Sequence, residues 1–173
     1  MIAAVCSAAV AGSALAAPPA RHIASIGALH LSYPARFDRR SVTSCEYRFT
    51  GVHGSCVRSL FIASRPLPAA PERPGWQFRT SEVAFELYRA PVQRSGGKNI
   101  VATSYSFPLS LDDFHIVGRG LRPLGGRKPR PDSQLELFFR ARGHNYWAIA
   151  WISAGVGRPD RSALASIVAS VEQ

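Results

Sequence analysis

Lysines, acidic residues and long apolar runs are scarce in this sequence, and the motifs of common catalytic sites are missing. A membrane-spanning helix needs roughly 20 consecutive apolar residues, and no run after residue 17 approaches that length. No transmembrane span is therefore predicted after residue 17. The sequence also has no Gly-x-Ser-x-Gly motif and no complete phosphate-binding loop. Serine hydrolases with a nucleophile elbow and P-loop proteins consequently have no support.

Metal-ligand spacing is missing as well. No histidine has another histidine one, three or four residues away, as a short-spaced zinc site requires. Asp112 and Asp113 are adjacent, but calcium takes about six to eight oxygen ligands, and Ser110-Leu-Asp-Asp113 fits a helix-capping box better. No metal site and no cofactor are predicted. The five histidines are His22, His30, His53, His115 and His144.

The first 17 residues carry no charge, and Ala14 and Ala16 fit an A-x-A cleavage site. We interpret residues 1–17 as a signal peptide, which predicts a secreted or extracytoplasmic protein of the bacterial cell envelope. The positively charged residues that normally precede the apolar segment are missing. An upstream start codon and a retained membrane anchor therefore stay open as alternatives.

Cysteine usage supports export. Cleavage removes Cys6 and leaves Cys45 and Cys56, and an even pair outside the cytoplasm is expected to form a disulfide. The bond would clamp a hairpin between strands near 47–50 and 57–63, and closing so short a loop stabilises by about 3 kcal/mol in the chain-entropy model. Pairing would also leave no thiol for cysteine chemistry.

Apolar alternation predicts most of the fold. Period-two patterns indicate strands near 29–33, 57–63, 83–88, 100–106, 135–140 and 146–152, joined mainly as hairpins. A short helix is expected from Ser110 through Val117. Apolar residues at positions 164, 167, 168 and 171 predict a terminal helix. The expected class is α+β, with a single antiparallel sheet of about six or seven strands. The C-terminal helix covers the sheet, and further short helices are an open possibility. One domain is expected over 26–173, after a flexible segment over 18–25.

This layout resembles the secreted relatives of the PsbP and Mog1 group. The resemblance rests on Leu29-His-Leu-Ser-Tyr-Pro34, on Tyr146-Trp-Ala-Ile-Ala-Trp151 and on the closing Leu164-Ala-Ser-Ile-Val-Ala-Ser-Val171. It implies an antiparallel sheet between helices and a binding or assembly role, and it supplies no catalytic residues. The group's helix after the first strand is expected to be reduced or missing here, because residues 38–44 are short, arginine-rich and followed at once by Cys45.

Positive charge is the remaining signal. The chain has 21 basic and 11 acidic residues, a formal charge of +10, and its only lysines are Lys98 and Lys128. A GC-rich coding genome would produce the same arginine excess, yet the charge draws the domain toward anionic partners. One loop from Gly118 to Pro131 gathers five cations, although it also fits a solvated loop. These candidate anion-binding residues are Arg119, Arg122, Arg127, Lys128 and Arg130.

The predicted function is that of an exported, non-enzymatic binding or accessory domain. Its partner would be an envelope protein or an anionic polymer or lipid surface. Specific nucleic-acid binding is not predicted, because no aromatic residues alternate with the cations of the loop. Two alternatives stay open: a small secreted hydrolase whose polar groups converge only in three dimensions, and a carrier with a small molecule between sheet and helix. Trp147 and Trp151 are expected to share one face of a strand as sheet cover.

Overall fold

The computed structural model describes most of the region expected to form the domain. The predicted signal segment lies outside the described residues. So do Tyr47 to Thr50, the expected first half of the cysteine-clamped hairpin, and nearly all of the proline-rich connection over 64–76. The described residues are 19–44, 56–66, 81–90, 94–95, 98–99, 103–119 and 133–172.

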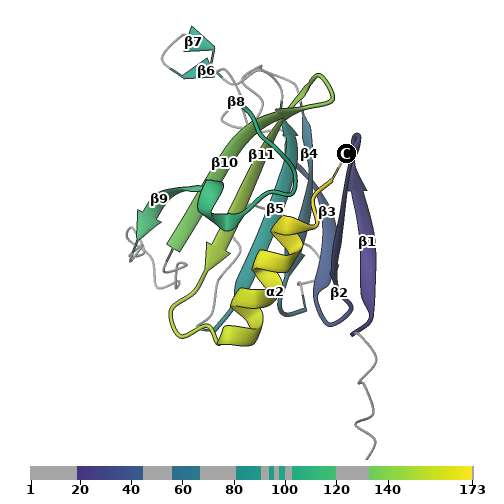
Figure 1. The fold of residues 1–173 in the computed structure, drawn as a ribbon, viewed down its shortest axis with the longest axis vertical. Coiled ribbons are helices and arrows are strands. Elements are labelled where there is room, and N and C mark those ends of the chain that lie inside the picture. Colours follow the sequence, from purple (N-terminus) through teal and green to yellow (C-terminus); the bar gives the residue numbers. More distant parts are fainter. Residues whose placement is uncertain are drawn as a thin grey trace, which may run out of the picture.

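A seven-stranded, mainly antiparallel sheet forms the centre of the molecule (Figure 1). Its order is β3-β4-β5-β11-β10-β8, and β9 also pairs with β10. Among the described strands, only β8 and β10 pair in parallel. The bounds are β3 Asp38–Ser44, β4 Val57–Ala63, β5 Val83–Ala90, β8 Thr103–Ser104, β9 His115–Arg119, β10 Ser133–Ala141 and β11 His144–Ile152. The α+β class predicted from the sequence is confirmed.

One face of this sheet packs against helix α2, Arg158–Ala169 (Figure 1). Leu164, Ile167 and Val168 of the helix are 0 % exposed, because their spacing places them on one side of the helix, toward the sheet. Pro159 lies in the first turn, where its missing N–H costs nothing. The predicted terminal helix is confirmed. No helix among the described residues has both the length and the apolar character needed to cross a membrane.

Strands β1 (Arg21–Ile26) and β2 (Leu29–Pro34) form a separate two-stranded sheet beside the helix. This corrects two predictions. The sheet is not single, and residues 21–25 belong to a strand where a flexible segment over 18–25 was expected. The reason is that Ala24 and Ile26 are buried in the core, so the segment is ordered by tertiary packing that local composition does not reveal.

One pairing expected from consecutive hairpins is wrong. Residues 83–88 do not form a hairpin with the next expected strand, because β5 lies between β4 and β11, and β8 joins the side of β10 away from β11. Two short strands that follow β5, β6 Arg94–Ser95 and β7 Lys98–Asn99, pair with each other.

The Ser110 capping box is present, but its helix ends after one 3-10 turn, η1 Leu111–Asp113. The chain then continues as β9, because residues 115–119 pair with the edge of β10. By contrast, the predicted hairpin of β10 and β11 is confirmed, with Arg142 and Gly143 in its turn at positive φ.

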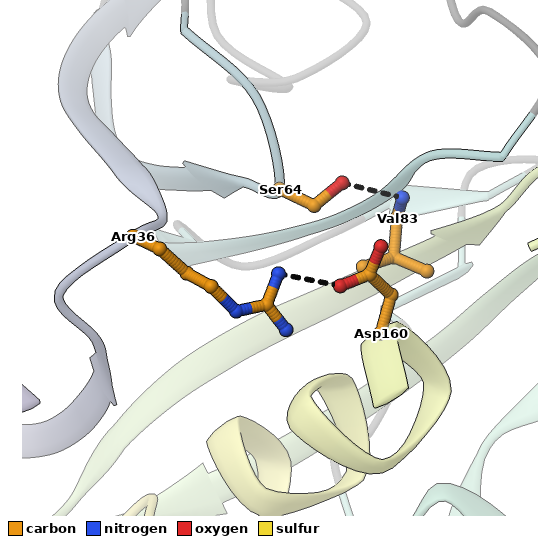
Figure 2. A network of polar contacts seen from close by, with 4 residues as sticks. All are labelled: Arg36, Ser64, Val83 and Asp160. Atoms are coloured by element: carbon orange, nitrogen blue, oxygen red, sulfur yellow. Dashed lines mark hydrogen bonds and ion pairs between the residues drawn. The ribbon is translucent and has the colours of Figure 1, made fainter. Parts of the chain in front are cut away.

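One ion pair holds the start of α2 to the turn between β2 and β3, and a hydrogen bond close by joins two strand ends (Figure 2). Nη1 of Arg36, after β2, lies 2.6 Å from Oδ1 of Asp160 in the first helical turn. Close by, the backbone N–H of Val83 donates to Oγ of Ser64 at 3.1 Å, which joins the start of β5 to the end of β4. The helix start and the strand ends are therefore held by short polar contacts as well as by the core.

Candidate functional site

The face of the large sheet that does not meet α2 carries the molecule's unusual chemistry, and we call it the second face. Side chains alternate across a strand, so the residues between the core positions of β4, β5, β11 and β10 lie on it. Most of its apolar side chains pack into two small clusters apart from the main core. The second face comprises Val42, Val57, Ser59, Phe61, Ala63, Ala84, Glu86, Tyr88, Gln134, Glu136, Phe138, Trp147, Ile149 and Trp151.

Two partly buried indoles frame this face. Trp147 and Trp151 are four residues apart on β11, and both pack against the second-face clusters, which confirms that they share a face. The ring of Trp147 lies 5.8 Å from that of Tyr88, and the ring of Trp151 lies 5.7 Å from that of Phe61. The tilted contacts hold both indoles in place.

Glu86 is a buried carboxylic acid in the middle of the second face. The residue is only 8 % exposed and sits opposite Phe61 on β4 and opposite Ile149 on β11. Burial raises its pKa from 4.5 to about 7, and hydrogen bonds from Ser59 and Tyr88 lower it by a smaller amount. Glu86 therefore changes charge near neutral pH.

Glu136 is a second carboxyl group on the same face. Nε2 of Gln134 donates to its Oε1 at 2.7 Å, and Trp147 supplies another hydrogen bond. Burial again raises the pKa above 4.5, against the lowering effect of these hydrogen bonds. Both carboxyl groups are thus held by neutral donors.

The register arranges these groups as a cross around Ile149. Glu86 faces Ile149 from β5, and Glu136 faces it from β10. Along β11, Trp147 and Trp151 stand two residues before and after it. Neighbouring strands are about 4.8 Å apart, so the two glutamate backbones, separated by one strand, are about 10 Å apart. Two acidic groups therefore flank a buried apolar centre between two indoles.

Three further ionisable groups share this face by register. Arg40 lies opposite Phe61, on the same row as Glu86 but beyond that ring. His115 on β9 lies opposite Glu136, and Arg140 follows Glu136 along β10. These groups stand at the rim of the cross.

A second candidate site lies at the end of the sheet where β10 turns into β11. Nη2 of Arg89 lies 2.9 Å from Nδ1 of His144, and because a guanidinium only donates, the His144 ring is the acceptor in this contact. Arg142 is exposed in the turn. Arg58 is the second residue of β4. The next residue, Ser59, pairs with Tyr88, so Arg58 lies at the same end of the sheet as Arg89. We call Arg58, Arg89, Arg142 and His144 the arginine end.

Acidic side chains are mostly used inside the molecule. Asp113 caps η1, Asp160 and Glu82 form ion pairs with Arg36 and Arg65, and Glu86 and Glu136 lie on the second face. Among the described side chains, the exposed acids are Asp112 and Glu172. The exposed arginines are Arg21, Arg36, Arg39, Arg58, Arg89, Arg140, Arg142, Arg158 and Arg161. The described surface is therefore strongly cationic.

Most of the loop predicted to bind anions falls outside the described residues. Arg119 ends β9, opposite Ser133, while Arg122, Arg127, Lys128 and Arg130 lie in the segment that is not described. Their role stays a prediction.

The disulfide prediction also reaches outside the described part, because Cys45 is not described. Cys56 immediately precedes β4, and the β3–β4 ladder ends with Ser44 opposite Val57. Ser44 and Val57 are the sequence neighbours of Cys45 and Cys56, and the disulfide stays a prediction. The partner strand of β4 is β3, where a strand near 47–50 was expected.

The histidines of the described chain are exposed at separate places: His22 and His30 on the β1–β2 hairpin, His115 on β9 and His144 on β11. No group of three or more His, Cys, Asp or Glu side chains suited to a metal ion occurs among the residues described.

Sequence reasoning missed Glu86 and Glu136. In the pattern around β5, Glu86 occupies the position of a solvated residue between apolar neighbours. One signal in the sequence could have revealed Glu86. Its neighbours on the same side of the strand, Ala84 and Tyr88, are uncharged, and this pattern indicates a strand that is covered on both faces.

Comparison with family models, with curated proteins and with solved structures found no match. The resemblance to the PsbP and Mog1 group thus stays an expectation that rests on apolar patterns.

Proposed function

We propose that this protein is an exported binding or accessory domain that engages an anionic surface of the cell envelope through its arginines. The observation that carries the proposal is the division of charge: acids are used in caps, ion pairs and the second face, while arginines project outward. Arginine suits this role because it stays charged and offers a planar set of donors to phosphate or carboxylate groups.

The arginine end is the described region best suited to such contact. Arg58, Arg89 and Arg142 are exposed there, and among the described residues the side-chain contact of Arg89 is with His144 and not with a carboxylate. Near an anionic membrane each cation contributes about 1 kcal/mol. Three arginines would add about 3 kcal/mol at low salt, and the predicted loop would add to this.

Vesicle binding tests the proposal. The full mature chain is mixed with vesicles of anionic phospholipid and with vesicles of neutral phospholipid, at low and high salt. Binding to anionic vesicles alone, weakened by salt, is expected because screening reduces exposed charge interactions. Equal binding to both vesicle types would contradict the proposal.

Three variants locate the contact. The first replaces Arg58, Arg89 and Arg142 by Gln, and the second replaces Arg122, Arg127 and Arg130 by Ala. The third, the matched control, replaces Arg39, Arg158 and Arg161 by Gln; these exposed residues start β3 and α2, at the opposite end of the sheet. Loss in the first two variants and retention in the control is expected. Equal loss in all three would show that only total charge matters.

A small secreted hydrolase is a second candidate, favoured by one observation. Glu86 and Glu136 are two carboxyl groups with raised pKa values on one face, and a general acid needs a pKa near the working pH. Hydrolysis of a substrate library that is abolished by Glu86→Gln and by Glu136→Gln would support it. The carrier alternative gains no such support, because Leu164, Ile167 and Val168 pack tightly between helix and sheet.

A further inference from the structure

The two edges of the small β1–β2 sheet, which lies at the margin of the molecule (Figure 1), are treated differently. In an antiparallel pair, alternate residues turn their backbone N–H and C=O groups away from the neighbouring strand. On β2, His30 turns its groups outward and exchanges two backbone hydrogen bonds with Glu172. The N–H of Ser32 likewise points outward and donates to Oγ of Ser170 at 2.9 Å. The outer edge of β2 is therefore closed by the C-terminal end of the chain.

The outer edge of β1 is open. Ser25 lies opposite His30, and Ile23 lies opposite Ser32, so the backbone groups of Ser25 and Ile23 point away from β2. Arg21 is the next alternate residue and turns its backbone the same way. Within the described part of the chain, no hydrogen bond reaches the backbone groups of Ile23 or Ser25 on this side. A strand edge with free backbone groups is a template for pairing with another strand.

Strand β1 also lacks the features that commonly protect such an edge, which are a proline, a bulge or a charge projecting over it. Residues 21–26 contain no proline and pair with β2 in a continuous register. The guanidinium of Arg21 lies back across β2, where it donates to Ser32 and to Oγ of Ser166 on α2 at 2.8 to 3.0 Å. Ile23, in the middle of the edge, is 75 % exposed, more than any other large apolar side chain among the described residues.

We propose that β1 pairs with β1 of a second copy of this chain, antiparallel, about a two-fold axis at Ile23. The outward positions 21, 23 and 25 are evenly spaced about Ile23, so the free backbone groups of the two copies meet in register. Each Ile23 then covers the other. Arg21 lies beside Ser25 of the second copy, so the two arginines do not face each other. The contact is isologous and uses both open edges, and it therefore ends at a dimer.

Salt separates this contact from the proposed anionic one. Both copies carry the same formal charge of +10, which opposes their association, and salt screens that repulsion. The dimer should therefore be stronger at high salt, whereas binding to anionic vesicles should be weaker. The dimer does not depend on the proposed anionic partner, so either contact can fail without the other.

Sedimentation equilibrium of the full mature chain, over a range of protein concentrations at low and high salt, tests the inference. A concentration-dependent dimer that is stronger at high salt is expected. Ile23→Lys removes the apolar contact and places two ammonium groups side by side, so it should weaken the dimer about ten-fold or more. Ile116→Lys is the matched control, because Ile116 is 46 % exposed on a different edge strand, β9, and this variant should dimerise as the parent does.

Amide hydrogen exchange followed by NMR identifies the pairing strand without any substitution. The amide protons of Ile23 and Ser25 should exchange freely in the monomer and become protected at concentrations where the dimer forms. A chain that stays monomeric under all these conditions would overturn the inference. So would a dimer in which these two amides stay unprotected, or one that Ile23→Lys and Ile116→Lys weaken equally. Protection of the same amides by an added peptide of alternating glutamate and valine, but not by raised protein concentration, would assign the edge to an acidic partner and also overturn it.

Discussion

The two faces of the central sheet treat polar groups in opposite ways. On the face covered by α2, the largest fully buried side chains are apolar or aromatic, from Leu29 on β2 to Leu164 and Ile167 on the helix. The second face buries Glu86 and partly buries Glu136 among indoles and a phenol. A protein gains stability from the first arrangement and gives up stability for the second. The helix-covered face therefore accounts for most of the apolar core, and the second face holds the carboxyl groups whose pKa values are raised by burial.

The largest expected effect lies on the helix-covered face. Leu164→Ala removes a side chain that is 0 % exposed, and such a cavity lowers the free energy of unfolding by about 2–5 kcal/mol. Urea unfolding followed by circular dichroism measures this loss. A loss below 1 kcal/mol would mean that the helix contributes little to the core.

Glu86 on the second face should make the free energy of unfolding depend on pH, whereas the apolar side chains of the helix-covered face do not titrate. Folded Glu86 holds its proton up to about pH 7, but the unfolded chain releases it near 4.5. The free energy of unfolding should therefore be level below pH 4.5, fall as pH rises toward 7, and level off above. The shift corresponds to about 3 kcal/mol.

Glu86→Gln isolates this contribution, because an amide of the same size does not titrate. In urea unfolding at several pH values, the variant should lose most of the fall between pH 4.5 and 7 and keep the smaller part due to Glu136, while Leu164→Ala should keep the whole fall. An unchanged fall in Glu86→Gln would assign the pH dependence to other groups.

The disulfide predicted from the sequence would join Cys45 to Cys56, and Cys56 lies directly before β4. Reduction should lower the melting temperature and leave the domain folded, with a loss of up to about 3 kcal/mol. Mass spectrometry and thiol titration of the denatured mature protein should find no reactive thiol before reduction. Two thiols before reduction would show that Cys45 and Cys56 are not paired.

The smallest effect is expected where α2 meets the β2–β3 turn. Asp160→Asn breaks the contact with Arg36 (Figure 2), whose side chain is 51 % exposed. Solvent screens such a pair, so the loss should stay below about 1 kcal/mol. Thermal unfolding in low and high salt measures this loss. A loss as large as that of Leu164→Ala would contradict the expectation that apolar contacts contribute most of the stability at α2.

Local patterns predicted those parts of the fold that local physics determines. The 3.6-residue period of Leu164, Ile167 and Val168 was sufficient for α2, and the turn at Arg142 and Gly143 was sufficient for the β10–β11 hairpin. The neighbours of β5 and the parallel pairing of β8 depend on contacts distant in sequence, which no local pattern encodes. The segment after η1 became a strand for the same reason.

The candidate site was harder to predict than the fold. Glu86 and Glu136 are 50 positions apart in the sequence and meet only because β11 lies between β5 and β10. The alternation of apolar and polar residues places Glu86 and Glu136 on a polar face. How deeply their carboxyl groups are buried depends on how side chains such as Trp147 and Tyr88 pack on that face. The residue types of the candidate site can therefore be read from the sequence, but their arrangement in space cannot.

The central claim is that the second face holds carboxyl groups which keep their protons to unusually high pH. Carbon-detected NMR titration of the glutamate side-chain carboxyl groups in the folded, ligand-free protein tests this directly, with Glu86→Gln and Glu136→Gln used to assign the two signals. The account predicts a midpoint of about 7 for Glu86 and a midpoint above 4.5 for Glu136. Midpoints near 4.5 for both would contradict it.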